Sequence, residues 1–177
     1  MKKLLKLTLV VVLVMSSTSL FAQKFGRINS QEIIENMAES KEAQTQLEAY
    51  VQELSAQAET IQVEFNTKYQ EYQKSVETWS DAIRQLKEKE LGDLQNRLRE
   101  FQQMAQQEIQ KKQMELFQPI QEKAINAINE VAKAGGYAFV YDTMSAAMVY
   151  VDEATVVDLG PAVRAKLGIT ETASAVQ

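Results

Sequence analysis

The side chains that could do chemistry in this chain of 177 residues are carboxylates, because it contains neither histidine nor cysteine. The usual ligands of zinc, haem and iron–sulfur sites are therefore missing, and so are a Ser-His-Asp triad and a cysteine nucleophile. Two carboxylate pairs lie close in sequence, Glu88 with Glu90 and Asp152 with Glu153. Acid–base catalysis needs such a pair in a cleft that shifts one pKa. A solvated helix face and a turn, where we expect these pairs, provide no such cleft.

Metal, phosphate and nucleic-acid sites are not indicated either. Asp142, Asp152 and Asp158 could ligate calcium, but their spacing is unlike an EF-hand loop. None of the six glycines falls in a phosphate-binding loop or a dinucleotide-binding turn. The formal net charge is −5, from 19 basic and 24 acidic residues, which is unlike a nucleic-acid-binding domain. We therefore expect no enzyme activity, no metal, no cofactor and no nucleic-acid partner.

Residues 1–22 have the pattern of a cleavable signal peptide, which predicts export to the periplasm. Three lysines among the first six residues precede an apolar stretch, and the small residue Ala22 lies before Gln23. The uninterrupted apolar run from Leu9 to Met15 is much shorter than the ~20 residues that span a bilayer. An uncleaved signal anchor is the alternative. The mature chain contains no other apolar segment of spanning length, so at most we expect an association with the membrane surface.

The middle of the chain, residues 39–119, is predicted to form an antiparallel coiled-coil hairpin. The sequence from Ser40 to Ala134 is rich in Glu, Gln, Lys, Ala and Leu, which favour helices. Apolar residues recur at steps of 4, 3 and 4, which is an eleven-residue repeat of about 3.67 residues per turn. This stripe consists of Ala43, Leu47, Tyr50, Leu54, Ala58, Ile61, Phe65, Tyr69, Tyr72, Val76 and Trp79.

The stripe stops near residues 77–81, where we place the tip of the hairpin. Thr78 and Asp81 match a capping box, which would start a second helix. The stripe of the returning helix consists of Ile83, Leu86, Leu91, Leu94, Leu98, Phe101, Ala105, Ile109, Leu116, Ile120, Ala124, Ala127 and Val131. The two stripes are expected to pack together as the seam of the hairpin.

Both ends of the mature chain are predicted to build a small body. Residues 23–38 would supply a first strand and a short helix, and residues 120–169 the end of the return helix, two paired strands and a terminal helix. We place these two strands at residues 137–141 and 147–151 and expect residues 170–177 to be a disordered tail. The fold class is therefore α+β and mainly α, with a long helical hairpin projecting from a small β-strand body.

The strands of this body are apolar on both faces, which predicts that both faces become buried. So small a body is marginal alone, and we expect it to assemble between subunits. The residues expected in this oligomerisation body are Phe25, Ile28, Tyr137, Phe139, Val140, Tyr141, Met148, Val149, Tyr150 and Val151.

Several apolar residues of the hairpin have no expected partner in a two-helix seam. Trp79, which belongs to the stripe, is expected at the tip of the hairpin. Large exposed apolar groups usually mark an interaction surface, and methionine adapts to varied partners. We therefore expect contacts with other proteins from Val51, Val63, Trp79, Met104, Met114 and Phe117. The alternative is that these residues pack against a neighbouring arm or the body.

Three stretches of sequence carry a family resemblance: KFGRIN (24–29), INAINEVAKAGGYAFVYD (125–142) and DLGPAVRAKLGI (158–169). Together with the order of elements, they resemble the Skp/OmpH family of periplasmic chaperones. The resemblance implies a homotrimer whose hairpins surround a cavity and bind unfolded outer-membrane proteins without ATP. Better-known members are basic whereas this chain is acidic, so no lipopolysaccharide site is carried over. The alternative function is that of a non-catalytic envelope adaptor or structural protein.

Overall fold

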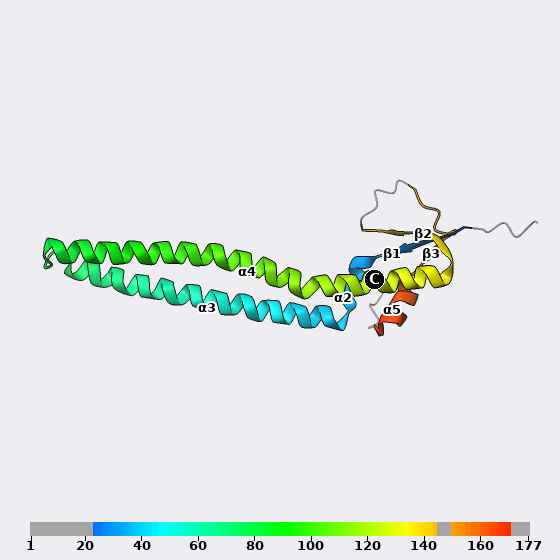
Figure 1. Cartoon of the computed structure of the whole chain (residues 1–177), viewed down its shortest axis with the longest axis horizontal. Coiled ribbons are helices and arrows are strands. Elements are labelled where there is room, and N and C mark those ends of the chain that lie inside the picture. Colours follow the sequence, from blue (N-terminus) through cyan, green and yellow to red (C-terminus); the bar gives the residue numbers. More distant parts are fainter. Residues whose placement is uncertain (1–22, 145–149, 171–177) are drawn as a thin grey trace, which may run out of the picture. The chain divides into compact units, whose positions relative to one another are not determined.

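The computed structural model describes residues 23–144 and 150–170. It divides into two compact units, one of residues 34–123 and the other of the residues before and after them. The elements are β1 (Lys24–Ile28), α2 (Ser30–Asn36), α3 (Ala38–Ser75), α4 (Asp81–Gly135), β2 (Tyr137–Asp142), β3 (Val156–Asp158) and α5 (Gly160–Leu167) (Figure 1). The predicted fold class is confirmed: the protein is α+β and mainly α, with a long helical hairpin and a small sheet.

In the unit of residues 34–123, helix α3 and the first part of α4 run antiparallel and side by side (Figure 1). The eleven-residue repeat forms the seam over most of this length. Ala43, Leu54 and Ile61 of α3 are buried, as are Leu94 and Ile120 of α4. Because few side chains are fully buried along such a seam, its stability depends strongly on each of them.

Toward the tip the predicted seam is wrong. Tyr69, Ile83 and Leu86, which the repeat assigns to it, are exposed. Charged residues join the helices instead, because Lys68 lies opposite Glu90 and can form an ion pair across the seam. Polar contacts therefore take over part of the role of the apolar seam in the last turns of the hairpin.

The connection between α3 and α4 covers residues 76–80, and the predicted capping box is wrong. The Thr78 hydroxyl donates to the carbonyl of Ser75 at 2.8 Å, so it closes the end of α3. The start of α4 is capped by Ser80, whose hydroxyl oxygen accepts from the amide of Ile83 at 3.4 Å. The chain thus needs five residues to turn, and the cap lies two residues after the position that the motif indicated.

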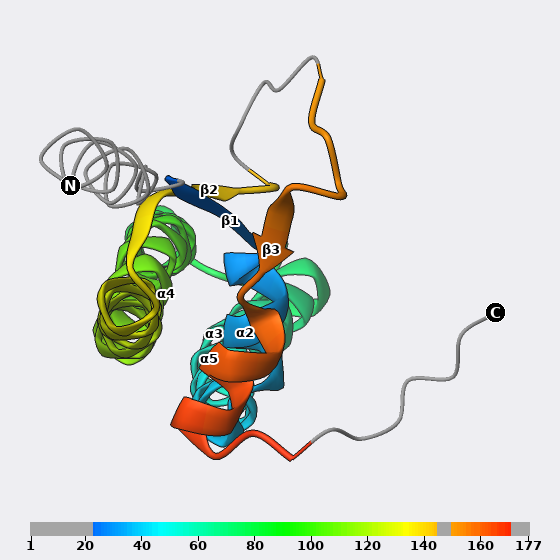
Figure 2. The same ribbon diagram turned by 90° about the vertical axis from the view of Figure 1, so that its right-hand side faces the viewer.

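The other unit contains a parallel three-stranded sheet in the order β2-β1-β3 (Figure 2). The strand predicted at residues 147–151 falls mostly on residues 145–149, which lie outside the described part, and Tyr150 and Val151 belong to no strand. The third strand is Val156–Asp158, which pairs with β1. Pairing with β1, more than the apolar character of the segment, decides where this strand forms.

One face of β1 packs into the core of this unit. Gly26 and Ile28 are buried, and so are Leu159 and Val163 at and after the start of α5. A Cβ atom on Gly26 would lie 2.4 Å from Cδ1 of Leu159, so only glycine allows this approach. Helix α5 ends at Gly168, whose φ of 69° is the left-handed conformation that a glycine C-cap favours.

Candidate functional site

Three of the six hairpin residues expected to contact other proteins are exposed. The exposed fractions are 55% for Val63, 48% for Met104 and 63% for Met114. Val51 and Phe117 are half-buried, so only part of each side chain is available to a partner. The exposed residues lie apart along the two helices, so the hairpin presents several separate apolar side chains and no single apolar patch.

Trp79 is half-buried and already has partners at the tip. Its ring packs edge-on against Tyr72, with 5.9 Å between the ring centroids. The ammonium group of Lys87 lies 5.8 Å from the Trp79 centroid, within the range of a cation–π interaction. Trp79 therefore stabilises the turn, and only its outer part could contact another protein.

Ion pairs connect α3 and α4 next to Trp79. Lys68 pairs with Glu90, and Lys87 lies 3.6 Å from both Glu71 and Glu90. The hydrogen bond from Lys68 lowers the pKa of Glu90 below its ordinary value, and the same bond raises the pKa of Lys68. The tip is thus most tightly joined where Glu90 is ionised and Lys68 is protonated.

Acid is expected to loosen the tip, which Trp79 fluorescence can follow. Because folding lowers the pKa of Glu90, its ion pair stabilises the hairpin above the ordinary glutamate pKa and is lost as the pH falls through the lowered value. Glu90→Gln should weaken the change in Trp79 emission between about pH 5 and pH 3. Asp93→Asn, one turn away on α4, is the control and should leave it unchanged. An unaltered acid transition in Glu90→Gln would show that another carboxylate controls the tip.

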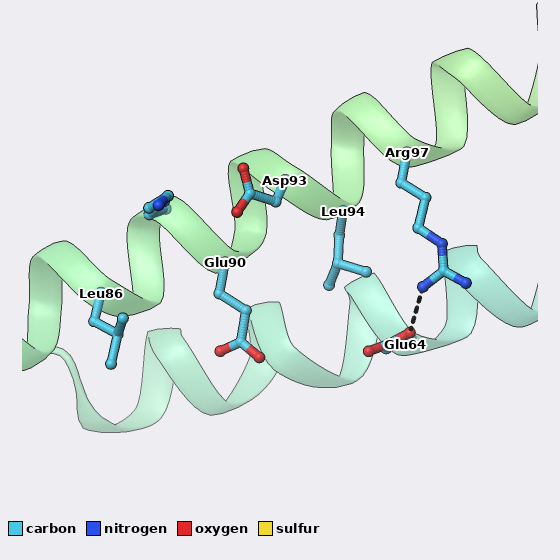
Figure 3. Close-up of a pocket in the computed structure, with 7 residues that line it drawn as sticks. Glu64, Leu86, Glu90, Asp93, Leu94 and Arg97 are labelled. Carbon is cyan, nitrogen blue, oxygen red and sulfur yellow. Dashed lines mark ion pairs between the residues drawn. The ribbon is translucent and has the colours of Figure 1, made fainter.

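An open hollow of about 490 Å³ lies beside this ionic region. In Figure 3, Glu90 and Leu94 of α4 point toward α3, and Arg97 reaches Glu64. The Arg97–Glu64 distance is 3.9 Å, so this rim is closed by a paired charge. The exposed Leu86 also lines the hollow. Its charged lining consists of Glu64, Lys89, Glu90, Asp93 and Arg97.

A second hollow, of about 260 Å³, is lined by Gln62, Phe65, Gln95, Leu98 and Arg99. Gln95 and Arg99 lie two positions after Asp93 and Arg97, which line the first hollow. Two positions correspond to a rotation of about 200° around a helix. The two hollows therefore lie on opposite sides of the seam. Sequence reasoning missed the second one because Phe65 and Leu98 both fit the seam repeat, and no motif marks a hollow that two helices share.

The sheet carries an exposed aromatic pair. Phe25 of β1 and Phe139 of β2 are register partners, so their side chains lie on the same face of the sheet. Their exposed fractions are 41% and 53%, whereas Gly26 and Ile28 on the other face of β1 are buried. This face of the small sheet therefore exposes two aromatic side chains within the described part of the chain.

The remaining residues expected in the oligomerisation body differ in exposure. Tyr150 is exposed outside any strand. Met148 and Val149 lie outside the described residues. The half-buried members are Tyr137, Val140, Tyr141 and Val151.

The sequence matches the family described as "Outer membrane protein (OmpH-like)" over residues 24–167, which is most of the chain. The chain belongs to the OmpH-like family. The match includes both arms of the hairpin and all three strands of the sheet, so the two units belong to one family architecture.

A solved structure supports the OmpH-like fold. It is the crystal structure of a candidate outer membrane chaperone (OmpH-like) from Caulobacter crescentus CB15, with a TM-score of 0.71 and 15% sequence identity. The match covers 82% of this chain and 83% of that chain. No curated protein matches the sequence significantly.

Several carboxylates of this OmpH-like chain, including members of both pairs that lie close in sequence, are engaged in structural contacts. The Tyr72 hydroxyl donates to Glu88 at 2.7 Å, and Arg27 lies 3.2 Å from Glu153. Burial alone would raise the pKa of Asp142, but hydrogen bonds from Ser30 and the Met144 amide lower it. Residues 23–144 and 150–170 contain no acidic cluster able to hold a metal ion. Among the helices of these two segments, none is long and apolar enough to cross a membrane.

Proposed function

We propose that this OmpH-like protein is an ATP-independent periplasmic holdase chaperone that binds unfolded outer-membrane β-barrel proteins and prevents their aggregation. The observation that carries the proposal is the spread of exposed apolar side chains along the hairpin, such as Val63, Met104 and Met114. An unfolded client presents apolar groups at irregular positions, and several weak contacts to one client add up by avidity. Membership of the OmpH-like family supports this reading.

Client release needs no fuel in this proposal. The sequence contains no phosphate-binding loop, and differential affinity for unfolded chains is sufficient to drive both capture and release. A client that folds into the membrane no longer offers unpaired strands, so its affinity for the hairpin falls. The signal-peptide pattern of residues 1–22 supports a periplasmic location.

We also propose that three chains assemble through their sheets, so that three hairpins surround the client. The exposed pair Phe25 and Phe139 supports an interface at this face, because burial of the exposed part of each aromatic side chain contributes about 1 kcal/mol. The other sheet residues of the oligomerisation body would lie in or near this interface. The alternative, an envelope adaptor, predicts one saturable partner in place of many unfolded ones.

The proposal is tested by diluting a urea-unfolded outer-membrane β-barrel protein into buffer with and without the purified mature chain. We expect suppression of light scattering without nucleotide, at three chains per client. Replacing both Met104 and Met114 with glutamine should raise the chain concentration needed about threefold, because two exposed apolar contacts are lost.

The matched control replaces Gln103 and Gln110, which are also exposed on α4, with alanine and should behave as the parent chain. A client that aggregates unchanged in the presence of a folded, assembled chain would contradict the holdase proposal and favour the adaptor. Equal loss in both double variants would show that the methionines have no special part.

A further inference from the structure

The side of the hairpin that carries the second hollow differs in chemistry from the opposite side. Phe65 lines this hollow, and its ring stacks on that of Tyr69 at 5.9 Å with an interplanar angle of 10°. Tyr69 is 44% exposed, so one face of the stacked pair is open to a partner. Leu98 adds an aliphatic wall from the other helix, and the amides of Gln62 and Gln95 complete the lining.

The rim of this hollow also carries an unneutralised positive charge. Arg99 is exposed, and its guanidinium donates to the side-chain oxygen of Asn96. No carboxylate of the described residues forms an ion pair with Arg99. On the opposite side the corresponding arginine, Arg97, is paired with Glu64. Arg99 can therefore offer a charge-assisted hydrogen bond to a carboxylate of another molecule.

A second apolar point lies on the same side at a defined distance. Val51 precedes Tyr69 by 18 residues, which is five full turns of α3 and about 27 Å along its axis. An extended strand rises about 3.3 Å per residue, so about eight residues bridge the two points. Transmembrane β-strands have about 9–11 residues and carry aromatic residues at their ends. A single strand of an unfolded barrel protein matches this spacing.

We propose that Phe65, Tyr69, Leu98 and Arg99, which we call the aromatic face, form the docking site for one extended strand of an unfolded barrel protein. A client aromatic ring enters the hollow against Phe65 and Tyr69, and a neighbouring client carboxylate pairs with Arg99. Val51 contacts an apolar residue farther along the same strand. The assignment rests on the holdase function and adds to it the place and the chemical class of the segment that is bound.

The test uses a dye-labelled peptide of ten residues that alternates apolar and polar positions, with phenylalanine next to glutamate near one end. Fluorescence anisotropy with the full mature chain should show that Tyr69→Ala and Arg99→Glu each weaken binding about tenfold. Leu86→Ala, an exposed position on the opposite side of the seam, should bind as the parent chain does. Tyr69→Phe keeps the ring stack and should also bind normally, and circular dichroism confirms that each variant is folded.

A charge-reversed peptide with lysine in place of glutamate completes a double-mutant cycle. It should bind the Arg99→Glu variant more tightly than it binds the parent chain. Normal binding by Tyr69→Ala and Arg99→Glu, or equal weakening by Leu86→Ala, would overturn the aromatic face as the docking site. If the parent chain suppresses client aggregation in that case, the holdase function stands and only its site is wrong. If aggregation is not suppressed but the cycle holds, the aromatic face binds extended segments and the holdase function fails.

Discussion

Aspartate in place of Phe139 is expected to convert the assembled protein into single chains. Phe139 is 53% exposed beside its register partner Phe25, and the proposed assembly covers both side chains. Because only the exposed half of Phe139 is available for burial, the substitution removes about 1 kcal/mol of apolar burial from every chain, and it adds the cost of burying an unpaired carboxylate. Sedimentation or light-scattering mass measured at neutral pH should fall from a trimer to a monomer, while circular dichroism remains strongly helical.

Val63→Asp is the control for a new charge at an exposed apolar position. Val63 is 55% exposed but lies on α3, in the hairpin, so its substitution should leave the mass unchanged. Phe139→Leu retains an apolar side chain and should keep most of the assembly. A Phe139→Asp protein that keeps the mass of the parent would place the interface on another surface, and an equal effect of Val63→Asp would implicate the hairpin.

The long helices of the hairpin can be predicted from the sequence because the eleven-residue repeat shows which face of each helix is buried. Ala43 and Leu54 are one repeat of eleven residues apart, and both are buried. Such a pattern repeats along each helix separately, so it can be recognised without knowing how the helices pair. The mainly helical fold class depends on this pattern and is confirmed.

The tip could not be predicted in the same way, because its contacts depend on the register between the two helices. Lys68 and Glu90 are unremarkable charged residues until the antiparallel pairing brings them together. A hydropathy pattern assigns Leu86 to the seam because it cannot represent an ion pair that replaces apolar packing. Complementary charges at positions whose numbers have a nearly constant sum would have been the available signal, as for Lys68 with Glu90 and Glu71 with Lys87.

Strand β3 and the aromatic face also depend on contacts between separate elements. Strand β3 has three residues and forms because β1 is beside it, which a local sequence pattern does not encode. Phe65 and Leu98 each match the seam of their own helix, yet together they line a hollow. Single-helix patterns identify residues that are apolar and inward-facing, but the shape between two helices appears only when both are placed.

Two leucines on α4 provide an energetic test of where the apolar seam ends. Leu94 and Leu86 both belong to the predicted stripe of α4 and both line the hollow of Figure 3, but their exposed fractions are 7% and 64%. Leu94→Ala leaves a cavity in the seam and should lower the free energy of unfolding by about 2–3 kcal/mol. Leu86→Ala should change it by less than about 0.5 kcal/mol.

Urea unfolding followed by Trp79 fluorescence measures both variants in the same hairpin, because Trp79 is the only tryptophan and lies at the tip. Since the chemical change is identical, the difference between the two midpoints isolates burial from helix propensity. Equal destabilisation by the two substitutions would mean that Leu86 packs between the helices after all, and the ionic tip would then be wrong. A large effect of Leu94→Ala alone would show that apolar packing holds the seam at Leu94 and that Leu86 adds little to the tip, where Lys68, Lys87 and Glu90 form ion pairs.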